Sequence, residues 1–399
     1  MPRLPVLASN PTGSSVIIIV SNSAKEEDHS YQTSRPDRNH LQATIWPRKD
    51  VAERDIPGDF LMRIVYYKDE VGNFGDDLNE LIWPRLLPQD VRDAPDTVMV
   101  GIGSLLDQAR FRDIDTNNKR VFVMGSGAAY GALPQGHEHW TYHAVRGALT
   151  AELIGRPQSA VTDGAILLAK LTDLVPQSAQ RNEILFMPHH RTCVNSRWPE
   201  AAANAGLTFV DPQWAPDRIL AAYGRAKLVV TEAMHGAIVA DTLRIPWIPV
   251  MISPEVSIFK WRDWASSLDL DYHPVALPPT ARLEAFRYDR IKRLTEASGR
   301  TVANPDGAAL DDAALIADFR QRFREEPQVI DAVAAPSGLK ALLKAAATRF
   351  DGRRMAQASE KLREVAAGRS YLSNDTLFQD RLGGMERAVE RLIADVRAG

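Results

Sequence analysis

The stretch LVVTEAMHGAIVADTLRIPWIPV at residues 228–250 contains a complete strand–helix–strand unit. Short apolar runs at 228–230 and 247–250 predict two buried strands, and the helical pattern at 233–243 predicts the helix between them. Short apolar strands that alternate with helices form parallel sheets that are covered by helices on both faces. The stretch therefore predicts an α/β fold.

The same alternation extends upstream through most of the chain. One series of strands and helices leads directly into this stretch, and a second series precedes it in the chain. The later series has strands at 184–187 and 207–210 with helices at 198–205 and 217–224, and the earlier one has strands at 64–67, 98–100, 121–124 and 142–145 with helices at 76–87 and 148–154. Two successive series indicate two doubly wound domains, divided near residues 172–182.

The two ends of the chain differ from this alternating part. Residues 1–61 mix polar, charged and proline residues without sustained periodicity, which is typical of disorder, and we interpret them as a disordered or extraneous leader. Beyond about residue 280 the strands stop, and helical patterns remain at 309–323, 338–350, 353–367 and 379–396. The expected units are therefore the leader, an N-terminal domain at 62–178, a C-terminal domain at 179–278 and a helical appendage at 279–399.

The composition excludes several classes of protein. Of 399 residues, 45% are hydrophobic and 25% are charged, and the net charge is −3, which is typical of a globular protein and not of a dedicated nucleic-acid binder. The single cysteine, Cys193, excludes an intramolecular disulfide and a cysteine-rich zinc site, and it fits a reducing compartment. The apolar run at 16–20 is far shorter than the roughly 20 residues of a membrane span, and no signal peptide is evident. We expect a cytoplasmic protein that contacts the inner membrane, if at all, peripherally.

One segment of the expected appendage is strongly basic. Residues 340–369 contain eight lysines and arginines against three acidic residues. A solvated helix face is the favoured interpretation, because blocks of charge usually face water. A surface for anionic lipid or for a lipid-linked substrate is the alternative.

Ligands of open α/β sheets bind beyond the carboxyl ends of the strands, so the loops after the predicted strands are the places to search. The first such loop, GNFGDD at 72–77, leaves a strand and opens a helix. Either Asp76 or Asp77 could cap the helix, but two acids together with Asn73 exceed that need, and Gly75 allows close approach of a ligand. The loop predicts a site that holds sugar hydroxyls or accepts a proton.

Two more loops follow in the N-terminal series. The loop at 124–128 is rich in glycine, but it is neither a Walker loop nor the full dinucleotide fingerprint. Arg146 stands where a strand ends and a helix begins. It can form a bidentate pair with a phosphate or a carboxylate, or it can pair with a nearby acid such as Asp163, and both interpretations stay open.

The C-terminal series contributes histidines. His189, His190 and Arg191 directly follow a buried strand, and such a cluster is hard to explain by packing. Adjacent histidines project in different directions, so they are not a typical zinc pair, and no metal is expected. His235 lies in the first turn of its helix, where the dipole and the free N–H groups favour an anion. It is the strongest catalytic candidate, and a capping or core histidine is the alternative.

Together these motifs resemble a known family. The series GNFGDD at 72–77, Val145-Arg146-Gly147, Thr162-Asp163-Gly164 and His235-Gly236 is similar in order and spacing to the polysaccharide pyruvyl transferases, especially members that decorate bacterial exopolysaccharides such as succinoglycan and xanthan. The resemblance covers roughly residues 62–275 and includes KWRDW at 260–264. Members of this branch begin near the position of Met62, which supports the interpretation of residues 1–61 as a leader.

The resemblance implies both a fold and a reaction. The fold is GT-B-like, with two Rossmann-like domains and the site in the cleft between them. The reaction moves pyruvate from phosphoenolpyruvate to a pair of sugar hydroxyls and forms a cyclic ketal. Phosphoenolpyruvate is a co-substrate, so no cofactor is expected. The acceptor is a saccharide, with a lipid-linked form at the inner membrane face left open.

This chemistry assigns expected roles to the candidate residues. His235 is expected to act as acid or base, with Asp76 and Asp163 as the other catalytic groups. A donor with a phosphate and a carboxylate needs several cations, and the residues expected to bind substrates are Asn73, Gly75, Asp77, Arg146, His189, His190, Arg191 and Lys260. Many members carry an arginine two residues before the histidine. This chain has Ala233 there, so Arg191 or Lys260 is expected to supply the charge.

Two other functions stay open from the residues. A GT-B glycosyltransferase that uses a nucleotide sugar would share the architecture, and Asp269-Leu270-Asp271 matches a metal-binding Asp-x-Asp pattern. An inactive sugar-binding homologue is the other, and Ala233 is the main argument for it. No nucleic-acid partner is expected, and the oligomeric state stays open.

Overall fold

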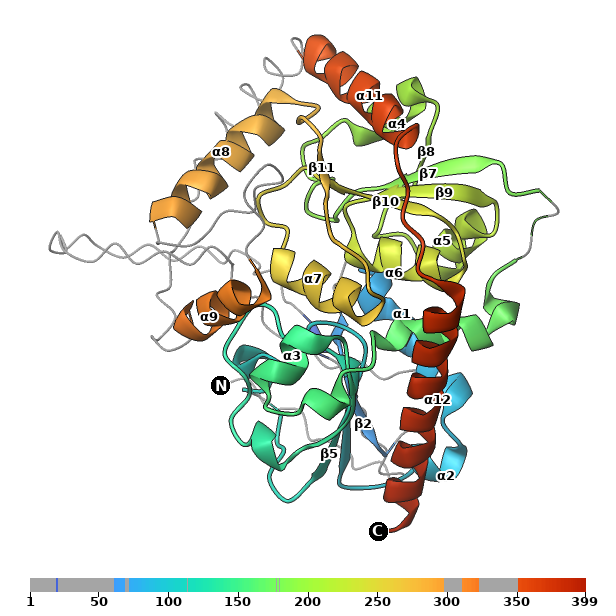
Figure 1. The fold of residues 1–399 in the computed structure, drawn as a ribbon, viewed down its shortest axis with the longest axis vertical. Coiled ribbons are helices and arrows are strands. Elements are labelled where there is room, and N and C mark those ends of the chain that lie inside the picture. Colours follow the sequence, from blue (N-terminus) through green and yellow to red (C-terminus); the bar gives the residue numbers. More distant parts are fainter. Residues whose placement is uncertain are drawn as a thin grey trace, which may run out of the picture.

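Two parallel sheets form the centre of the protein (Figure 1). The computed structural model describes residues 19–20, 61–68, 72–112, 114–176, 178, 180–297, 311–322 and 351–399. The first sheet has four strands in the order β2 (Arg63–Val65), β4 (Thr97–Val100), β5 (Arg120–Ser126) and β6 (Thr141–Val145). The second has five strands in the order β11 (Val275–Ala276), β10 (Trp247–Met251), β9 (Ala226–Thr231), β7 (Glu183–Met187) and β8 (Thr208–Phe209). A short parallel pair joins β1 (Ile19–Val20) to β3 (Tyr67–Lys68).

Helices connect and cover these strands. The first half contains α1 (Phe74–Leu86), α2 (Gln89–Arg92), α3 (Ala148–Leu153) and the short 3₁₀ segments η1 (Gln108–Arg110), η2 (His137–His139), η3 (Pro157–Ser159), η4 (Gly164–Lys170) and η5 (Thr172–Leu174). The second half contains α4 (Trp198–Ala205), α5 (Pro216–Tyr223), α6 (Met234–Thr242) and α7 (Ile258–Ser267). The described helices that follow are α8 (Arg282–Ala297), α9 (Asp312–Arg322), α11 (Gly352–Ala366) and α12 (Asp375–Arg397).

The strand–helix–strand unit at 228–250 is confirmed as β9, α6 and β10. In the pairing of β9 with β10, Val229 lies opposite Trp247, and all five residues of β10 are buried. Every residue of α6 except His235 is buried, because this helix contacts both its own sheet and η4 and α1 of the first half. The α/β class with parallel sheets is therefore confirmed, and the domain boundary near 172–182 stays a prediction.

The C-terminal helices return to both sheets. Figure 1 shows α12 running beside the first sheet and α11 beside α4 of the second half. The segment between them forms an antiparallel bridge in which Tyr371 pairs with Trp247. Phe378, Leu382 and Met385 of α12 are buried in the same apolar cluster as strands of the first sheet. These helices therefore close the core of both halves.

Some elements differ from the sequence-based expectation. The first helix begins at Phe74, so Asn73 occupies the N-cap position and Asp76 and Asp77 lie inside the first turn; the interpretation of either acid as the cap is wrong. Helices α7 and α8 were not among the expected helical patterns. The expected helical pattern at 338–350 lies outside the described residues, and so do residues 340–350 of the basic segment. In the described part of that segment, exposed pairs join Lys361 to Glu364 and Arg363 to Glu360, as expected of a solvated face.

Among the parts of the chain that the structure describes, no helix is both long and apolar enough to cross a membrane.

Candidate active site

The candidate site lies where the carboxyl ends of both sheets meet. His235 is in the first turn of α6, directly after β9, and Gly75 is in the first turn of α1, after β3. A Cβ atom on Gly75 would lie 1.8 Å from Nδ1 of His235, so only glycine lets the backbone of α1 approach the imidazole this closely. The backbone N–H of Phe74 donates to the carbonyl of Pro212 at 2.9 Å and ties α1 to the second half.

His235 faces the carboxylate of Asp163. Its Nε2 lies 3.7 Å from Oδ2 of Asp163, which is too long for a hydrogen bond, and both atoms are buried without a hydrogen-bond partner. The other oxygen, Oδ1, accepts from the backbone N–H of Ala165 at 2.9 Å and fixes the carboxylate at the start of η4. Because an unmade hydrogen bond of a buried polar group costs free energy, this pair is suited to receive a ligand atom between or beside its members.

The capping interpretation of His235 does not hold. Ala233 occupies the N-cap position of α6, and no side chain caps this helix. The imidazole is 14% exposed, and Asp163 beside it is fully buried. His235 is therefore a mostly buried group, with a small exposed part, at the meeting point of the two sheets.

Asp76 is the second titratable group at this point. Asn73 donates a hydrogen bond from Nδ2 to Oδ2 of Asp76, which fixes the carboxyl orientation. Burial raises the pKa of Asp76 to about 6, although the nearby charges of His235, Arg110 and Lys260 lower it. A carboxyl group with a pKa this close to neutrality can both take and give a proton under working conditions.

Asp77 faces away from this pair and supports the start of α1. It lies 2.8 Å from Nζ of Lys68, and its Oδ2 accepts from the backbone N–H of Asn73 at 3.1 Å. Lys68 also lies 2.7 Å from Oε1 of Glu80. The structure thus places Asp77 in an ion-pair network next to the site and not beside His235.

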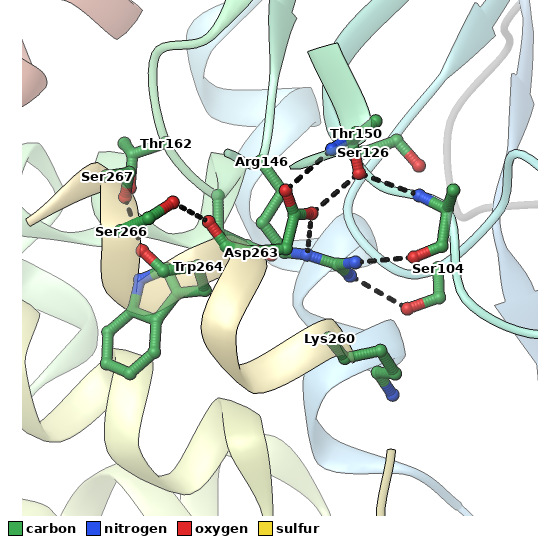
Figure 2. Close-up of polar contacts among 12 residues, drawn as sticks. Ser104, Ser126, Arg146, Thr150, Thr162, Lys260, Asp263, Trp264, Ser266 and Ser267 are labelled. Atoms are coloured by element: carbon green, nitrogen blue, oxygen red, sulfur yellow. Dashed lines mark hydrogen bonds and ion pairs between the residues drawn. The ribbon is translucent and has the colours of Figure 1, made fainter. Parts of the chain in front are cut away.

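Arg146 is held by a buried ion pair (Figure 2). Its Nε donates to Oδ2 of Asp263 at 3.0 Å, its NH1 donates to Oγ of Ser104 at 2.8 Å, and its NH2 donates to the carbonyl of Ala128 at 2.7 Å. Both charged side chains are fully buried. Of the two interpretations left open for Arg146, pairing with an acid is the one observed, but the acid is Asp263 and not Asp163.

Asp263 also binds the start of α3. It accepts hydrogen bonds from the backbone N–H of Thr150 at 2.8 Å and from its hydroxyl at 2.6 Å. A Cβ atom on Gly147 would lie 1.5 Å from the carbonyl oxygen of Asp263, so glycine is required where the two segments touch. Arg146 and Asp263 thus join three loops of the first sheet to α7 of the second half.

The loop after β7 is organised by Glu232. This buried carboxylate accepts from the backbone N–H of His189 at 3.0 Å and from the hydroxyl of Thr192 at 2.6 Å. It also accepts from the backbone N–H groups of Ile252 and Ser253 at 2.8 and 2.7 Å. Glu232 therefore holds together the loops that follow β7, β9 and β10, next to His235.

The histidine–arginine cluster supplies less positive charge than expected. The rings of His189 and His190 stack with centroids 4.2 Å apart, and burial together with the neighbouring charges holds the pKa of His189 well below its ordinary value. Arg191 lies 3.0 Å from Oε1 of Glu255, which also pairs with Arg287. His189 is therefore neutral at physiological pH, and the guanidinium of Arg191 already has a carboxylate partner.

Lys260 is in the first turn of α7, where Oγ of Ser257 accepts from its backbone N–H at 3.4 Å. Its Nζ donates to the phenol oxygen of Tyr130 at 2.8 Å. Figure 2 shows its side chain extending away from the Arg146–Asp263 pair. Within the described ranges it has no carboxylate partner, so among the cations expected to bind the donor it is the one without an ion pair.

Several residues around the site were not anticipated from the sequence. Glu232 stands in the same motif as His235, so its position was a usable signal. Asp263 lies in the stretch KWRDW, whose only signal in the sequence is its resemblance to the family. Arg110, Tyr130 and Glu255 are isolated in the sequence, and only the fold brings them here.

A metal site finds no support in the side chains that the structure describes. No group of three or more His, Cys, Asp or Glu side chains there could hold a metal ion. Asp269 and Asp271 of the Asp-x-Asp pattern are exposed in the turn after α7.

Comparisons with known proteins identify relatives of this chain. The family model for polysaccharide pyruvyl transferases matches residues 115–254, a range that includes Arg146, Asp163, His189 and His235. The chain is also 35% identical over 230 residues to the succinoglycan biosynthesis protein ExoV of Rhizobium meliloti (strain 1021), which covers 56% of this chain and 71% of the relative. No solved structure matches. The chain therefore belongs to the polysaccharide pyruvyl transferase family and is a transferase.

Proposed function

We propose that this protein moves pyruvate from phosphoenolpyruvate to two hydroxyls of a saccharide in an exopolysaccharide repeat unit and forms a cyclic ketal. Membership of the family and the relative named for succinoglycan biosynthesis support the reaction class. The single structural observation that carries the proposal is the buried, unpartnered pair of His235 and Asp163 beside Asp76. The two sheets that meet at this point fit a GT-B-like arrangement of two Rossmann-like domains.

The proposed reaction has two additions at one carbon. A proton is added to C3 of phosphoenolpyruvate, which becomes a methyl group and leaves C2 electrophilic. One sugar hydroxyl then adds to C2 and loses its proton. The bond from C2 to the phosphate ester oxygen breaks, inorganic phosphate leaves, and the second hydroxyl adds to C2 and closes the ketal. The first hydroxyl proton balances the proton given to C3, and the second leaves with the phosphate.

Two residues at the site can carry out these proton transfers. We assign His235 to protonation of C3, because its Nε2 has no protein hydrogen-bond partner and lies at the candidate site, 3.7 Å from Oδ2 of Asp163. Asp76 is assigned to the acceptor hydroxyl, because a carboxyl with a pKa of about 6 is mostly ionised at neutral pH and can accept a proton. Asn73 orients the carboxyl group of Asp76 by a hydrogen bond, and the absence of a side chain at Gly75 leaves room for the imidazole of His235.

The two alternatives have less support. A nucleotide-sugar glycosyltransferase with a metal at Asp269 and Asp271 would need those acids at the site, and they lie exposed in the turn after α7. The main argument for an inactive sugar-binding homologue was Ala233, which stands where many family members have an arginine. That residue is the N-cap of α6, and His235, the residue we assign to proton transfer, follows two residues later in the same helix.

Binding of the donor separates these functions. Because a ligand that binds only the folded state stabilises it by mass action, phosphoenolpyruvate at 100 times its dissociation constant should add about 2.7 kcal/mol to the free energy of unfolding. We therefore expect phosphoenolpyruvate to raise the melting temperature, and a panel of nucleotide sugars at equal concentration to leave it unchanged. A rise with a nucleotide sugar alone would support the glycosyltransferase instead.

A further inference from the structure

Three side chains that no part of the proposed mechanism uses gather beside Asp76. Arg110 ends η1 in the loop after β4, Tyr130 lies in the loop after β5, and Lys260 is in the first turn of α7 after β10. All three segments leave the carboxyl ends of their strands, and two of them belong to the first sheet and one to the second. The three side chains therefore belong to the edge where the candidate active site lies.

Arg110 is held in place by its turn and by an aromatic ring, without an ion pair to a described carboxylate. Oδ1 of Asp107 accepts from the backbone N–H of Ala109 at 2.9 Å and fixes the turn of η1. The guanidinium carbon of Arg110 lies 4.6 Å from the ring centroid of Tyr67, and its Nε is buried without a hydrogen-bond partner. A cation stacked on an aromatic ring keeps its edge free for an anion, because the ring contacts only its face.

Lys260 and Tyr130 form the other side of the cluster. Nζ of Lys260 donates to the phenol oxygen of Tyr130 at 2.8 Å. Burial raises the pKa of Tyr130, but Lys260, Arg191 and Arg110 together outweigh it and hold the pKa below its ordinary value. The charges of Arg110 and Lys260 also both act on Asp76. The segments that carry Arg110 and Tyr130 also touch, because the backbone N–H of Gln108 donates to the carbonyl of Ala132 at 2.7 Å. Arg110, Tyr130 and Lys260 therefore lie around one region.

Two described carboxylates act electrostatically on these cations, Asp76 on both and Asp107 on Arg110, but neither forms an ion pair with them. In the described ranges of the chain, no ion pair joins Arg110 or Lys260 to a carboxylate, whereas Arg146 and Arg191 each have one. Half-buried positive charges without a paired carboxylate favour the binding of an anion. Two cations and a phenol suit a dianionic phosphate ester, whose three terminal oxygens accept several charge-assisted hydrogen bonds.

We propose that Arg110, Lys260 and Tyr130 form the phosphate-binding site of this protein. The identity of the ligand as phosphoenolpyruvate rests on the proposed function, but recognition of the phosphate group does not. The site holds the leaving group next to Asp76 and His235, and its positive charges stabilise the phosphate as the C2–oxygen bond breaks.

Isothermal titration calorimetry of the full chain tests this assignment. The probes are inorganic phosphate, phosphoenolpyruvate and pyruvate, and the variants are Arg110→Gln and Lys260→Gln. The matched control is Arg112→Gln, because Arg112 is exposed two residues after Arg110. Each site variant should weaken binding of phosphate and of phosphoenolpyruvate about ten- to 100-fold, which is the usual worth of a hydrogen bond to a charged group. The control should bind both as the unaltered protein does.

The outcomes distinguish this site from the proposed function. Phosphate binding that depends on Arg110 and Lys260, in a protein that does not use phosphoenolpyruvate, would keep the site and overturn the function. Phosphoenolpyruvate that binds the Arg110→Gln and Lys260→Gln variants with unchanged affinity would overturn the site and leave the function standing. Absence of any phosphate binding by the unaltered protein also overturns the site. If Lys260→Gln folds poorly, Lys260→Arg replaces it in the test. This variant keeps the positive charge and should retain most of the phosphate affinity.

Discussion

Replacement of His235 by alanine should reduce turnover by about 100- to 10,000-fold, the usual contribution of a general acid or base. The reason is that Nε2 of His235 is buried, has no protein hydrogen-bond partner and faces Asp163 at 3.7 Å. The substitution removes no hydrogen bond from the fold, so the melting temperature should change little. Turnover measured at saturating substrates, with circular dichroism to confirm folding, checks the result.

Gly75→Ala is a matched test that leaves the imidazole in the chain. The added methyl group would lie 1.8 Å from Nδ1 of His235 in the present geometry, so the ring or α1 must shift. Because proton transfer depends on placement, we expect turnover to fall although every functional group remains. Near-normal turnover of a folded His235→Ala variant would remove this histidine from the mechanism, whatever Gly75→Ala does.

Replacement of Asp263 by asparagine should lower the free energy of unfolding by about 3–5 kcal/mol. The change keeps the shape of the side chain but leaves the guanidinium of Arg146 fully buried without its countercharge. It also weakens the two hydrogen bonds that Thr150 donates to this carboxylate. Urea unfolding followed by tryptophan fluorescence measures the difference, since Trp261 and Trp264 flank the position on α7.

The control for this prediction is Asp269→Asn in the exposed turn after the same helix, which should change stability by less than about 0.5 kcal/mol. A paired change of Arg146→Met and Asp263→Leu should recover much of the loss, because two apolar side chains leave no buried charge uncompensated. A loss below about 1 kcal/mol for Asp263→Asn would show that the pair does not join the two halves as described.

The sheets could be predicted from the sequence because buried parallel strands are short apolar runs. The strand of residues 247–250 is one such run, and β10 matches it within one residue. Helix α8 was missed because its sequence, RLEAFRYDRIKRLTEA, is dominated by charged residues, and packing of a few positions such as Glu284 and Tyr288 supports it instead. Helix formation there depends on tertiary contacts that a local pattern does not contain.

The candidate site was predictable where one motif carries both the strand end and the side chain. His235, Asp76 and Asp163 stand in such motifs, and the fold brings them to one edge. The partner of Arg146 was not predictable, since Asp263 is 117 residues away and Asp163 is an equally plausible acid in the sequence. Arg110 lies in a short 3₁₀ turn without a motif, so only the folded chain places its charge near Asp76.

One assay tests pyruvyl transfer by this protein directly. The full chain is incubated with isotopically labelled phosphoenolpyruvate and exopolysaccharide repeat units that lack pyruvate, offered free and lipid-linked at the same concentration. We expect that phosphate is released only with an acceptor present, and that the labelled carbons appear in a ketal on the saccharide. Transfer of sugar from a nucleotide sugar to the same acceptor, with phosphoenolpyruvate left unchanged, would contradict it.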